Sequence, residues 1–181
     1  MLFMQYLKIP KERVAVLIGE GGKTKRYIEK RTNTTIVIED GTIMVDSDPE
    51  NSINEWVSKD IVLAIGRGFS PAIALKLLKE NNVLEVLQLR DFVNTKKSAI
   101  RVKGRIIGKE GRTRRYIEQI TGCYMSVYGK TVALIGAYDE VYIAKEAIGM
   151  LLNGSPHSTV NKFLERKKQE QMEDRRRAMA W

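Results

Sequence analysis

A glycine-rich segment, from Ile18 to Glu29, holds the residue types best suited to bind a phosphate, and its sequence is IGEGGKTKRYIE. Its GKT triplet at 22–24 matches the end of the nucleotide-binding motif G-x-x-x-x-G-K-[ST], in which backbone amides cradle the phosphates. That motif also needs a glycine at position 17, where this chain has Leu17. The segment is therefore a poor candidate for nucleotide hydrolysis.

The same segment occurs a second time, 89 residues further along the chain. There the sequence is IGKEGRTRRYIE, from Ile107 to Glu118, and eight of the twelve positions are identical to the first copy. The lysine of the supposed nucleotide motif is replaced by Arg112. Both copies share G-x-x-G followed by a basic helical segment, so an internal duplication built on this element is the pattern to explain.

A G-x-x-G turn placed before a helix can bind the phosphate backbone of a nucleic acid. Glycines at its two ends let the chain turn sharply and let another backbone come close. The helix that follows presents unpaired amide groups and a partial positive charge at its start. Both copies therefore predict an anion-binding turn, and the basic residues that follow favour a polyanion.

The surrounding sequence predicts the same order of elements in each copy: strand, helix, helix, strand, strand, helix. In the first copy the predicted strands are 3–9, 34–38 and 42–45, and the helices begin at 11, 23 and 48. In the second copy the strands are 86–90, 123–128 and 131–135. The first helix is capped by Ser98 and ends at 107, the second begins at 112, and the third is 139–152. A helix starting at Ser70-Pro71 links the copies, and a charged helix, 158–174, with a frayed end at 175–177, follows the second.

With this motif and this order of elements, each half of the chain resembles a type I KH domain. The residues that carry the resemblance are I-G-x-x-G-x-x-x-x-Y-I, present in both copies. The resemblance implies an α+β fold with two tandem type I KH domains (βααββα), each a three-stranded sheet packed on helices, plus a linking helix and a C-terminal helix. We expect the first domain with its linking helix at 1–82, the second at 83–154, and a basic C-terminal helix and tail at 155–181. A KH domain uses its G-x-x-G loop to clamp about four nucleotides of a single strand.

The resemblance places the two middle residues of each loop against the RNA phosphates. In the first copy these are Glu20 and Gly21, and the carboxylate of Glu20 opposes a phosphate at a cost of about 1 kcal/mol near a surface. In the second copy they are Lys109 and Glu110, and the lysine favours a phosphate. We therefore expect the second domain to be the main RNA clamp and the first to be a weaker RNA site or a protein-docking site. The predicted RNA-binding residues are Gly108, Lys109, Glu110, Gly111, Arg112, Arg114, Arg115, Arg105, Gly19, Glu20, Gly21, Gly22, Lys23, Lys25 and Arg26.

The charge and composition of the chain favour a nucleic-acid partner in the cytoplasm. The net charge is +9, from 31 lysines and arginines against 22 acidic residues, and such a balance favours a polyanion. No apolar run approaches the roughly 18 residues that suggest a membrane span, and the first residues lack the pattern of a secretory signal. The single cysteine, Cys123, excludes an internal disulfide and a zinc site built on several cysteines. We expect no cofactor, no metal and no membrane partner.

No pattern of residues predicts catalysis, so we expect a protein that is not an enzyme. Glu29 and Glu118 recur, but no nucleophile recurs with them, and salt bridges to neighbouring basic residues explain them better. His157 has no second histidine or cysteine close in sequence that would make a metal site. The recurring tyrosines, Tyr27 and Tyr116, are expected in the core rather than stacked on bases.

Beyond the two domains, the chain resembles one family of small-subunit ribosome assembly factors, the partner-of-Nob-one or Dim-two family. The resemblance is carried by the two loops, the bridging segment GRGFSP at 66–71, and the closing GSPHSTV at 154–160 with the basic helix after it. The compact two-domain form is similar to the archaeal branch. The resemblance implies binding near the 3′ end of small-subunit ribosomal RNA during its maturation. It also implies three protein partners: the Nob-one endonuclease, a dimethyltransferase of ribosomal RNA, and the alpha subunit of archaeal initiation factor two.

Two alternatives stay open on the residues alone. The first is a protein-interaction scaffold in which both KH surfaces bind protein partners, and Glu20 favours it for the first domain. The second is a tandem-KH RNA-binding subunit of an RNA-degradation or transcription complex, which would show no preference for the ribosomal 3′ sequence. The residues themselves support a single-stranded RNA clamp with two units, whereas the ribosomal assignment rests on the resemblance.

Overall fold

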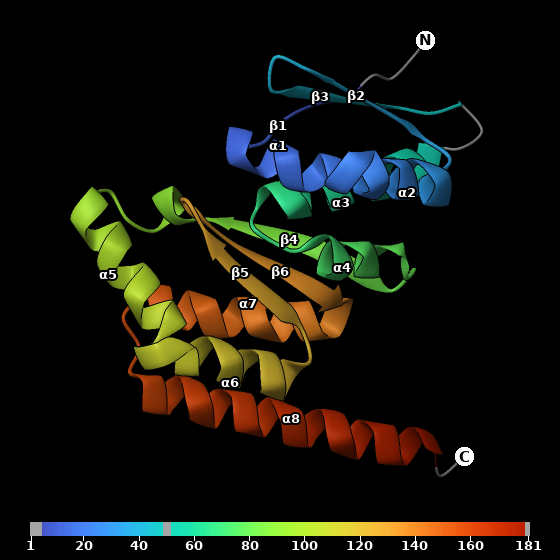
Figure 1. Ribbon diagram of the computed structural model, residues 1–181. Coiled ribbons are helices and arrows are strands. Elements are labelled where there is room, and N and C mark those ends of the chain that lie inside the picture. Colours follow the sequence, from blue (N-terminus) through green and yellow to red (C-terminus); the bar gives the residue numbers. More distant parts are fainter. Residues whose placement is uncertain (1–4, 49–51, 180–181) are drawn as a thin grey trace. The chain divides into compact units, whose positions relative to one another are not determined.

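The structure, a computed structural model, describes residues 5–48 and 52–179. The chain divides into two compact units, 1–84 and 85–181, and each contains a three-stranded sheet with helices on it (Figure 1). The order of strands and helices in each unit is that of a type I KH domain. The predicted fold class is therefore confirmed.

The first unit carries the first G-x-x-G loop between two helices that lie on its sheet. The strands are β1 (Gln5–Lys8), β2 (Thr35–Glu39) and β3 (Thr42–Asp46), in the order β1-β3-β2 with both pairs antiparallel. The helices are α1 (Lys11–Ile18), α2 (Lys23–Thr32) and α3 (Ser52–Gly66), and the loop forms the short turn η1 (Glu20–Gly22). The linking helix α4 (Pro71–Ala74), capped by Ser70, continues as η3 (Leu75–Leu78) and packs on α3, as predicted.

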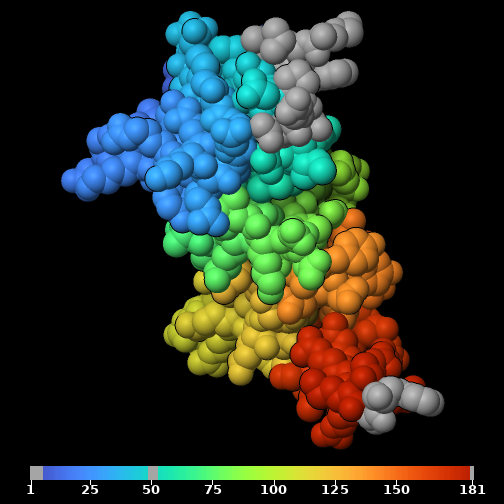
Figure 2. Space-filling view, turned by 90° about the vertical axis from the view of Figure 1, so that its right-hand side faces the viewer, coloured from blue at the N-terminus to red at the C-terminus, as the bar shows by residue number. Residues whose placement is uncertain are grey.

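The second unit repeats this arrangement and adds a helix at its end. Its strands are β4 (Asn82–Gln88), β5 (Tyr124–Tyr128) and β6 (Thr131–Ala137), in the order β4-β6-β5. After the turn η4 (Leu89–Asp91) come α5 (Lys96–Ile107), the loop turn η5 (Lys109–Gly111), α6 (Arg112–Thr121) and α7 (Tyr138–Leu152). The last helix, α8 (His157–Met179), packs on α6 and α7, and the surfaces of α6 and α8 adjoin in Figure 2.

The core of each unit anchors the two helices that flank its loop. Leu17 from α1 and Ile28 from α2 are fully buried in the first unit. The residues 89 positions later, Ile106 from α5 and Ile117 from α6, are fully buried in the second. Burying a side chain of this size stabilises the folded state by about 1.5–3 kcal/mol. Each loop therefore starts and ends on helices whose inner faces are fixed.

Several predicted boundaries differ from those in the structure. The predicted cap Ser98 is wrong: α5 begins at Lys96 because Thr95 caps it. The Ser98 amide donates to Thr95 Oγ1 at 3.1 Å, and the Thr95 amide donates to Ser98 Oγ at 3.3 Å, so Ser98 is the third helical residue of a capping box. The strand β4 begins earlier, at Asn82. Residues 175–177, predicted to fray, are helical in α8, where Glu173 and Arg177 form an ion pair one turn apart, at 3.8 Å. The predicted residues 3–4 of the first strand and 49–51 of the third helix lie outside the described residues.

Candidate nucleic-acid interface

The first glycine of each loop is required by both its backbone and its neighbour. Gly19 has φ 72° and ψ 176°, and Gly108 has φ 74° and ψ 171°, a region that is open essentially to glycine alone. A Cβ at Gly19 would overlap Thr24 Oγ1, and one at Gly108 would overlap Thr113 Oγ1. The sharp turn inferred from the glycine spacing is therefore confirmed in both units, and the close neighbour of each first glycine is a threonine of the following helix.

The two loops differ at their third position. Gly21 and Glu110 both adopt the left-handed conformation, with φ of 57° and 54°. Glycine adopts this conformation freely, whereas a residue with a Cβ carries a cost of about 1–2 kcal/mol. The second loop therefore holds a strained glutamate where the first holds a glycine.

The last glycine of each loop leaves the start of the next helix open to an anion. Gly22 (φ 77°) caps α2 and Gly111 (φ 74°) caps α6, and neither has a side chain to accept from the first helical amides. The first of these amides, of Lys23 and Arg112, already donate to the carbonyl oxygens of Glu20 and Lys109, whereas the helix dipole favours an anion beside the loop. Phosphate binding at the two loops therefore stays a prediction.

An arginine in the second turn of the following helix braces each loop. Arg26 donates from its guanidinium to the carbonyl oxygen of Gly21, and Arg115 donates to that of Glu110, both at 2.6 Å. From the sequence, these arginines are predicted only as RNA contacts. In the structure they also fix the left-handed residue of the loop, while their side chains stay exposed.

The charges at the loop tips distinguish the two units. Glu20 forms an ion pair with Lys23 at 3.8 Å, and Glu110 forms one with Arg112 at 3.5 Å, all four side chains being exposed. Such surface pairs contribute about 0–1 kcal/mol, so a phosphate can displace them. Lys109 has no carboxylate within ion-pairing distance among the described residues. The second loop therefore presents an uncompensated cation at its tip.

The recurring glutamates join the second helix of each unit to the edge strand. Glu29 accepts from the amide of Ile36 in β2, and Glu118 accepts from the amide of Met125 in β5, both at 2.8 Å. The expected salt bridges are confirmed: Lys25 to Glu29 at 2.8 Å, and Arg114 to Glu118 at 3.7 Å. The glutamates therefore satisfy edge amides and set the spacing between helix and strand, which is a structural role that the sequence did not reveal.

Arg105, a predicted RNA contact, is held by backbone carbonyls within the second unit. Its two terminal nitrogens donate to the carbonyl oxygens of Leu151, at 3.2 Å, and Ser155, at 2.6 Å. Its own carbonyl oxygen lies 3.0 Å from the Nε2 atom of His157. These bonds tie α5 to the segment between α7 and α8, and a contact of Arg105 with RNA stays a prediction.

The recurring tyrosines occupy different environments in the two units. Tyr27 is 48% exposed, so its predicted place in the core is wrong. Tyr116 is half-buried because α8 packs on α6, and its hydroxyl donates to Glu165 at 2.9 Å. Partial burial and then the Glu165 carboxylate raise the pKa of Tyr116.

A pocket of about 450 Å³ lies beside the second loop, between the starts of α6 and α8. It is lined by Gly108, Lys109, Arg112, Thr113, Tyr116, His157 and Asn161. The last four residues of this set are not among the RNA-binding residues predicted from the sequence. The threonine is one of the eight identities between the copies and could have been found, whereas Asn161 reaches the pocket only because α8 docks there.

The part of the chain that the structure describes offers no cluster of metal ligands and no helix that could span a membrane. Over residues 5–48 and 52–179, no group of three or more His, Cys, Asp or Glu side chains is placed to hold a metal ion. Within the same residues, no helix is both long and apolar enough to cross a membrane. Cys123 is 2% exposed, and its burial raises the pKa of the thiol to about 11, as fits a residue of the core.

Family models of KH domains match both halves of the chain. Residues 83–169 match the model described as a eukaryotic type KH domain (KH-domain type I), and residues 4–55 match the KH domain model. A KH domain-containing protein of Methanocaldococcus jannaschii is 49% identical over 169 residues, which are 92% of this chain and 74% of that protein. The RNA-binding protein pno-1 of Caenorhabditis briggsae is 31% identical over 117 residues, which are 63% of this chain and 42% of that protein.

Solved structures of similar proteins extend over nearly the whole chain. Dim2p from Pyrococcus horikoshii is 50% identical with a TM-score of 0.84, and the match covers 90% of this chain and 98% of that one. A complex of a/eIF2alpha, aDim2p and rRNA from the same organism contains a chain that is 49% identical with a TM-score of 0.87. That match covers 94% of this chain and 96% of the other.

Proposed function

Because the chain belongs to the Dim-two family of two-KH-domain proteins, which includes the Dim2p relatives, we propose that it is a non-catalytic single-stranded RNA-binding protein. In this proposal each G-x-x-G loop holds the phosphate backbone while bases lie in the groove between helices and sheet. The protein acts in assembly of the small ribosomal subunit, by binding near the 3′ end of its rRNA during maturation.

The single observation that supports RNA clamping best is the geometry of the loops. The chain builds the same turn twice: a glycine-only first residue, a left-handed third residue braced by an arginine, and a glycine that opens the next helix. This arrangement places the positive end of a helix dipole where a backbone phosphate can approach it. Its repetition in two units argues for a shared function in binding one strand.

The second unit is the stronger clamp in this proposal. Lys109 carries an uncompensated positive charge at the loop tip, and Arg112 and Arg114 follow it on α6. In the first unit the same tip position holds Glu20, whose side chain is 92% exposed. Its carboxylate disfavours a phosphate there, so the first unit is a weaker RNA site or a docking site for protein.

The protein partners follow from relatives rather than from this chain's own residues. A solved complex contains a/eIF2alpha, aDim2p and rRNA. We extend both partners to this chain: the alpha subunit of initiation factor two and ribosomal RNA. The Nob-one endonuclease and the rRNA dimethyltransferase rest on the family resemblance alone and are proposed on that basis.

Fluorescence anisotropy tests the RNA proposal with the full chain. The probe is a labelled single strand that copies the 3′ end of the small-subunit rRNA of the same organism, and a shuffled strand is the control. Two loop variants are compared with the wild type: Lys109→Asp with Glu110→Asp, and Glu20→Asp with Gly21→Asp. Aspartate tolerates the left-handed conformation, which Asp40 already adopts at φ 47° in this chain, so both variants keep the turn.

The proposal expects preferential binding to the ribosomal strand, with a salt slope of roughly −0.7 per phosphate contacted. The Lys109 variant should lose about tenfold or more in affinity, as expected when charge and phosphate contacts are removed. The Glu20 variant should change affinity little. Equal binding of both strands would favour a general RNA-degradation or transcription subunit. If no strand binds, or neither loop variant matters, the protein-scaffold alternative replaces the proposal.

A further inference from the structure

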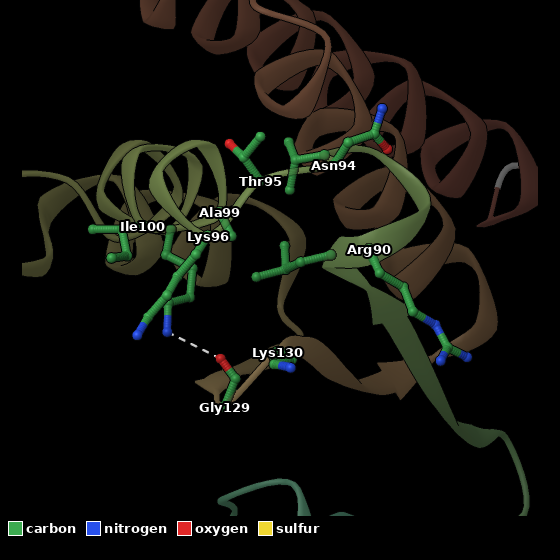
Figure 3. A pocket seen from close by; sticks show the side chains of 11 residues that line it. Arg90, Asn94, Thr95, Lys96, Ala99, Ile100, Gly129 and Lys130 are labelled. Carbon is green, nitrogen blue, oxygen red and sulfur yellow. Dashed lines mark hydrogen bonds between the residues drawn. The ribbon is translucent and has the colours of Figure 1, made fainter.

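The second unit contains a basic pocket well away from its G-x-x-G loop. The pocket has a volume of about 610 Å³ and lies between the start of α5, the turn after β4 and the tip of the β5–β6 hairpin (Figure 3). The lining residues of α5, from Lys96 to Lys103, stand five to twelve residues before Gly108, which is about 8–18 Å along the axis of α5. A volume of this size is typical of a ligand-binding cleft.

The lining of the pocket suits a nucleotide. Its cations are Arg90, Lys96, Lys103 and Lys130. Among the described residues that line it, none is acidic, although Arg90 makes a weak ion pair with Asp91 at 3.9 Å. The walls include apolar side chains, and Ile100 is 61% exposed there, so a base can cover apolar surface while its phosphate meets the lysines.

Two hydrogen bonds between distant segments keep the pocket in shape. Lys103 donates from Nζ to the carbonyl oxygen of Gly129 at 2.9 Å, the dashed contact in Figure 3. The amide of Leu89 donates to the carbonyl oxygen of Lys130, also at 2.9 Å. The hairpin tip is thereby fixed to both α5 and the turn after β4.

The first unit has a cavity at the position that matches this pocket, but its lining is less basic. At the matching position a smaller cavity of about 360 Å³ is lined by Lys11, Val14, Asp40 and Gly41. The residues 89 positions later all line the larger pocket: Ile100, Lys103, Gly129 and Lys130. One lysine and the carboxylate of Asp40 therefore stand where the second unit has two lysines and no acid.

The difference arises from an insertion before α5. In the first unit two residues separate β1 from α1, whereas seven residues, 89–95, separate β4 from α5 in the second. α5 also has twelve residues against eight in α1, and the extra turn at its start carries Lys96. The inserted segment and extra turn supply the additional wall and charge of the pocket.

We propose that this pocket binds a further nucleotide of the same RNA strand, beyond those held at the second G-x-x-G loop. The proposal rests on the proposed function, since it names where the clamped strand continues. It assigns to the second unit a longer RNA track than a single KH loop provides, and it assigns no such extension to the first.

The test compares strands of two lengths by fluorescence anisotropy. The short strand has about four nucleotides, the number that a KH loop clamps, and the long strands extend it to about twice that length on the 5′ or the 3′ side. The pocket variants are Lys96→Gln with Lys130→Gln, and Gly129→Asp. The matched controls are Lys79→Gln with Lys97→Gln, exposed lysines outside the pocket, and Gly129→Asn, which adds the same volume without a charge.

Gly129→Asp is compatible with the fold because no atom lies within 4 Å of a Cβ at Gly129, and Asp40 has a similar φ at the matching position. One long strand should bind wild type about tenfold more tightly than the short strand, and both pocket variants should remove most of that gain. The lysine pair should also reduce the salt slope for that long strand by roughly 1.4, for two phosphate contacts. The pocket variants should bind the short strand as tightly as wild type does. Both control variants should bind the short and long strands as wild type does.

The outcomes separate the two proposals. If the short strand binds but neither extension adds affinity, or the control pair loses as much as the pocket pair, the pocket proposal fails and the loop clamp stands. The pocket proposal also fails if the pocket variants weaken both strand lengths equally. If no strand of either length binds, the proposed function fails together with the pocket.

Discussion

The guanidinium of Arg115 donates a hydrogen bond to the carbonyl oxygen of Glu110 at 2.6 Å, five residues earlier in the chain. The equivalent pair in the first unit, Arg26 and Gly21, has the same bond at the same distance. Each arginine thus holds the left-handed residue of the loop from the helix that follows it. A loop that is already in its binding conformation loses less entropy when RNA binds.

This bond predicts that Arg115→Lys weakens RNA binding although it keeps the charge. A lysine is a point charge without the planar guanidinium fork, so the loop loses its brace. The free energy of unfolding should fall by only about 0.5–1.5 kcal/mol, while the affinity for a ribosomal 3′ strand falls about tenfold with an unchanged salt slope. Urea unfolding and anisotropy measure the two effects.

Arg101→Lys is the charge-matched control for this prediction, because Arg101 is exposed on α5 before the loop. It should leave both quantities unchanged. Equal affinity of Arg115→Lys and wild type would contradict the bracing role and leave only a charge contribution.

The steric requirement at Gly108 predicts a severe effect of Gly108→Ala. The alanine would carry its Cβ into Thr113 Oγ1 and adopt a glycine-only conformation. Together these should lower the free energy of unfolding by about 2–4 kcal/mol. Gly104→Ala, four residues earlier, is the control: it lies within α5 with open space around it and should stabilise the protein by about 0.5–1 kcal/mol. Urea unfolding of both variants checks the opposite signs.

The strained glutamate of the second loop predicts that Glu110→Gly improves RNA binding. Glycine adopts the φ of 54° freely, and the change removes a carboxylate from the loop tip. Affinity for single-stranded RNA should rise severalfold, and the free energy of unfolding should rise by about 1 kcal/mol or less. Glu110→Gln separates the two causes, because it removes the charge but keeps the strain. If Glu110→Gln also raised the free energy of unfolding, relief of backbone strain would not explain the gain in Glu110→Gly.

The buried thiol of Cys123 predicts a loss of stability at alkaline pH. Burial raises its pKa from 9.0 to about 11 in the folded state, so the folded protein holds this proton more tightly than the unfolded chain does. The corresponding stability is complete below a pH of about 9 and is lost as the pH rises to about 11, an effect of roughly 3 kcal/mol. Urea unfolding across this range should show a smaller decline for Cys123→Ala than for wild type. Parallel declines would mean that the thiol is not the titrating group.

Local patterns in the sequence were sufficient to predict the doubled KH architecture. The two G-x-x-G turns and the order of elements come from spacings within a few residues, and the duplication is found by matching these local patterns at an offset of 89 residues. The buried pairs Leu17 with Ile106 and Ile28 with Ile117 follow the same repeat. Helical periodicity and turn glycines are determined locally, because they depend on the backbone conformation of adjacent residues.

The sequence by itself therefore predicted which turns are suited to bind phosphate and determined which helices carry them, whereas the tertiary structure decided what surrounds each turn. The pocket behind α5 depends on Lys103 meeting Gly129, 26 residues away, and the half-buried Tyr116 depends on Glu165, 49 residues away. No spacing rule links such partners, because their approach depends on how the sheet, the hairpin and α8 pack. For that reason the two nearly identical motifs differ in the charges and side chains near them and in how deeply those side chains are buried.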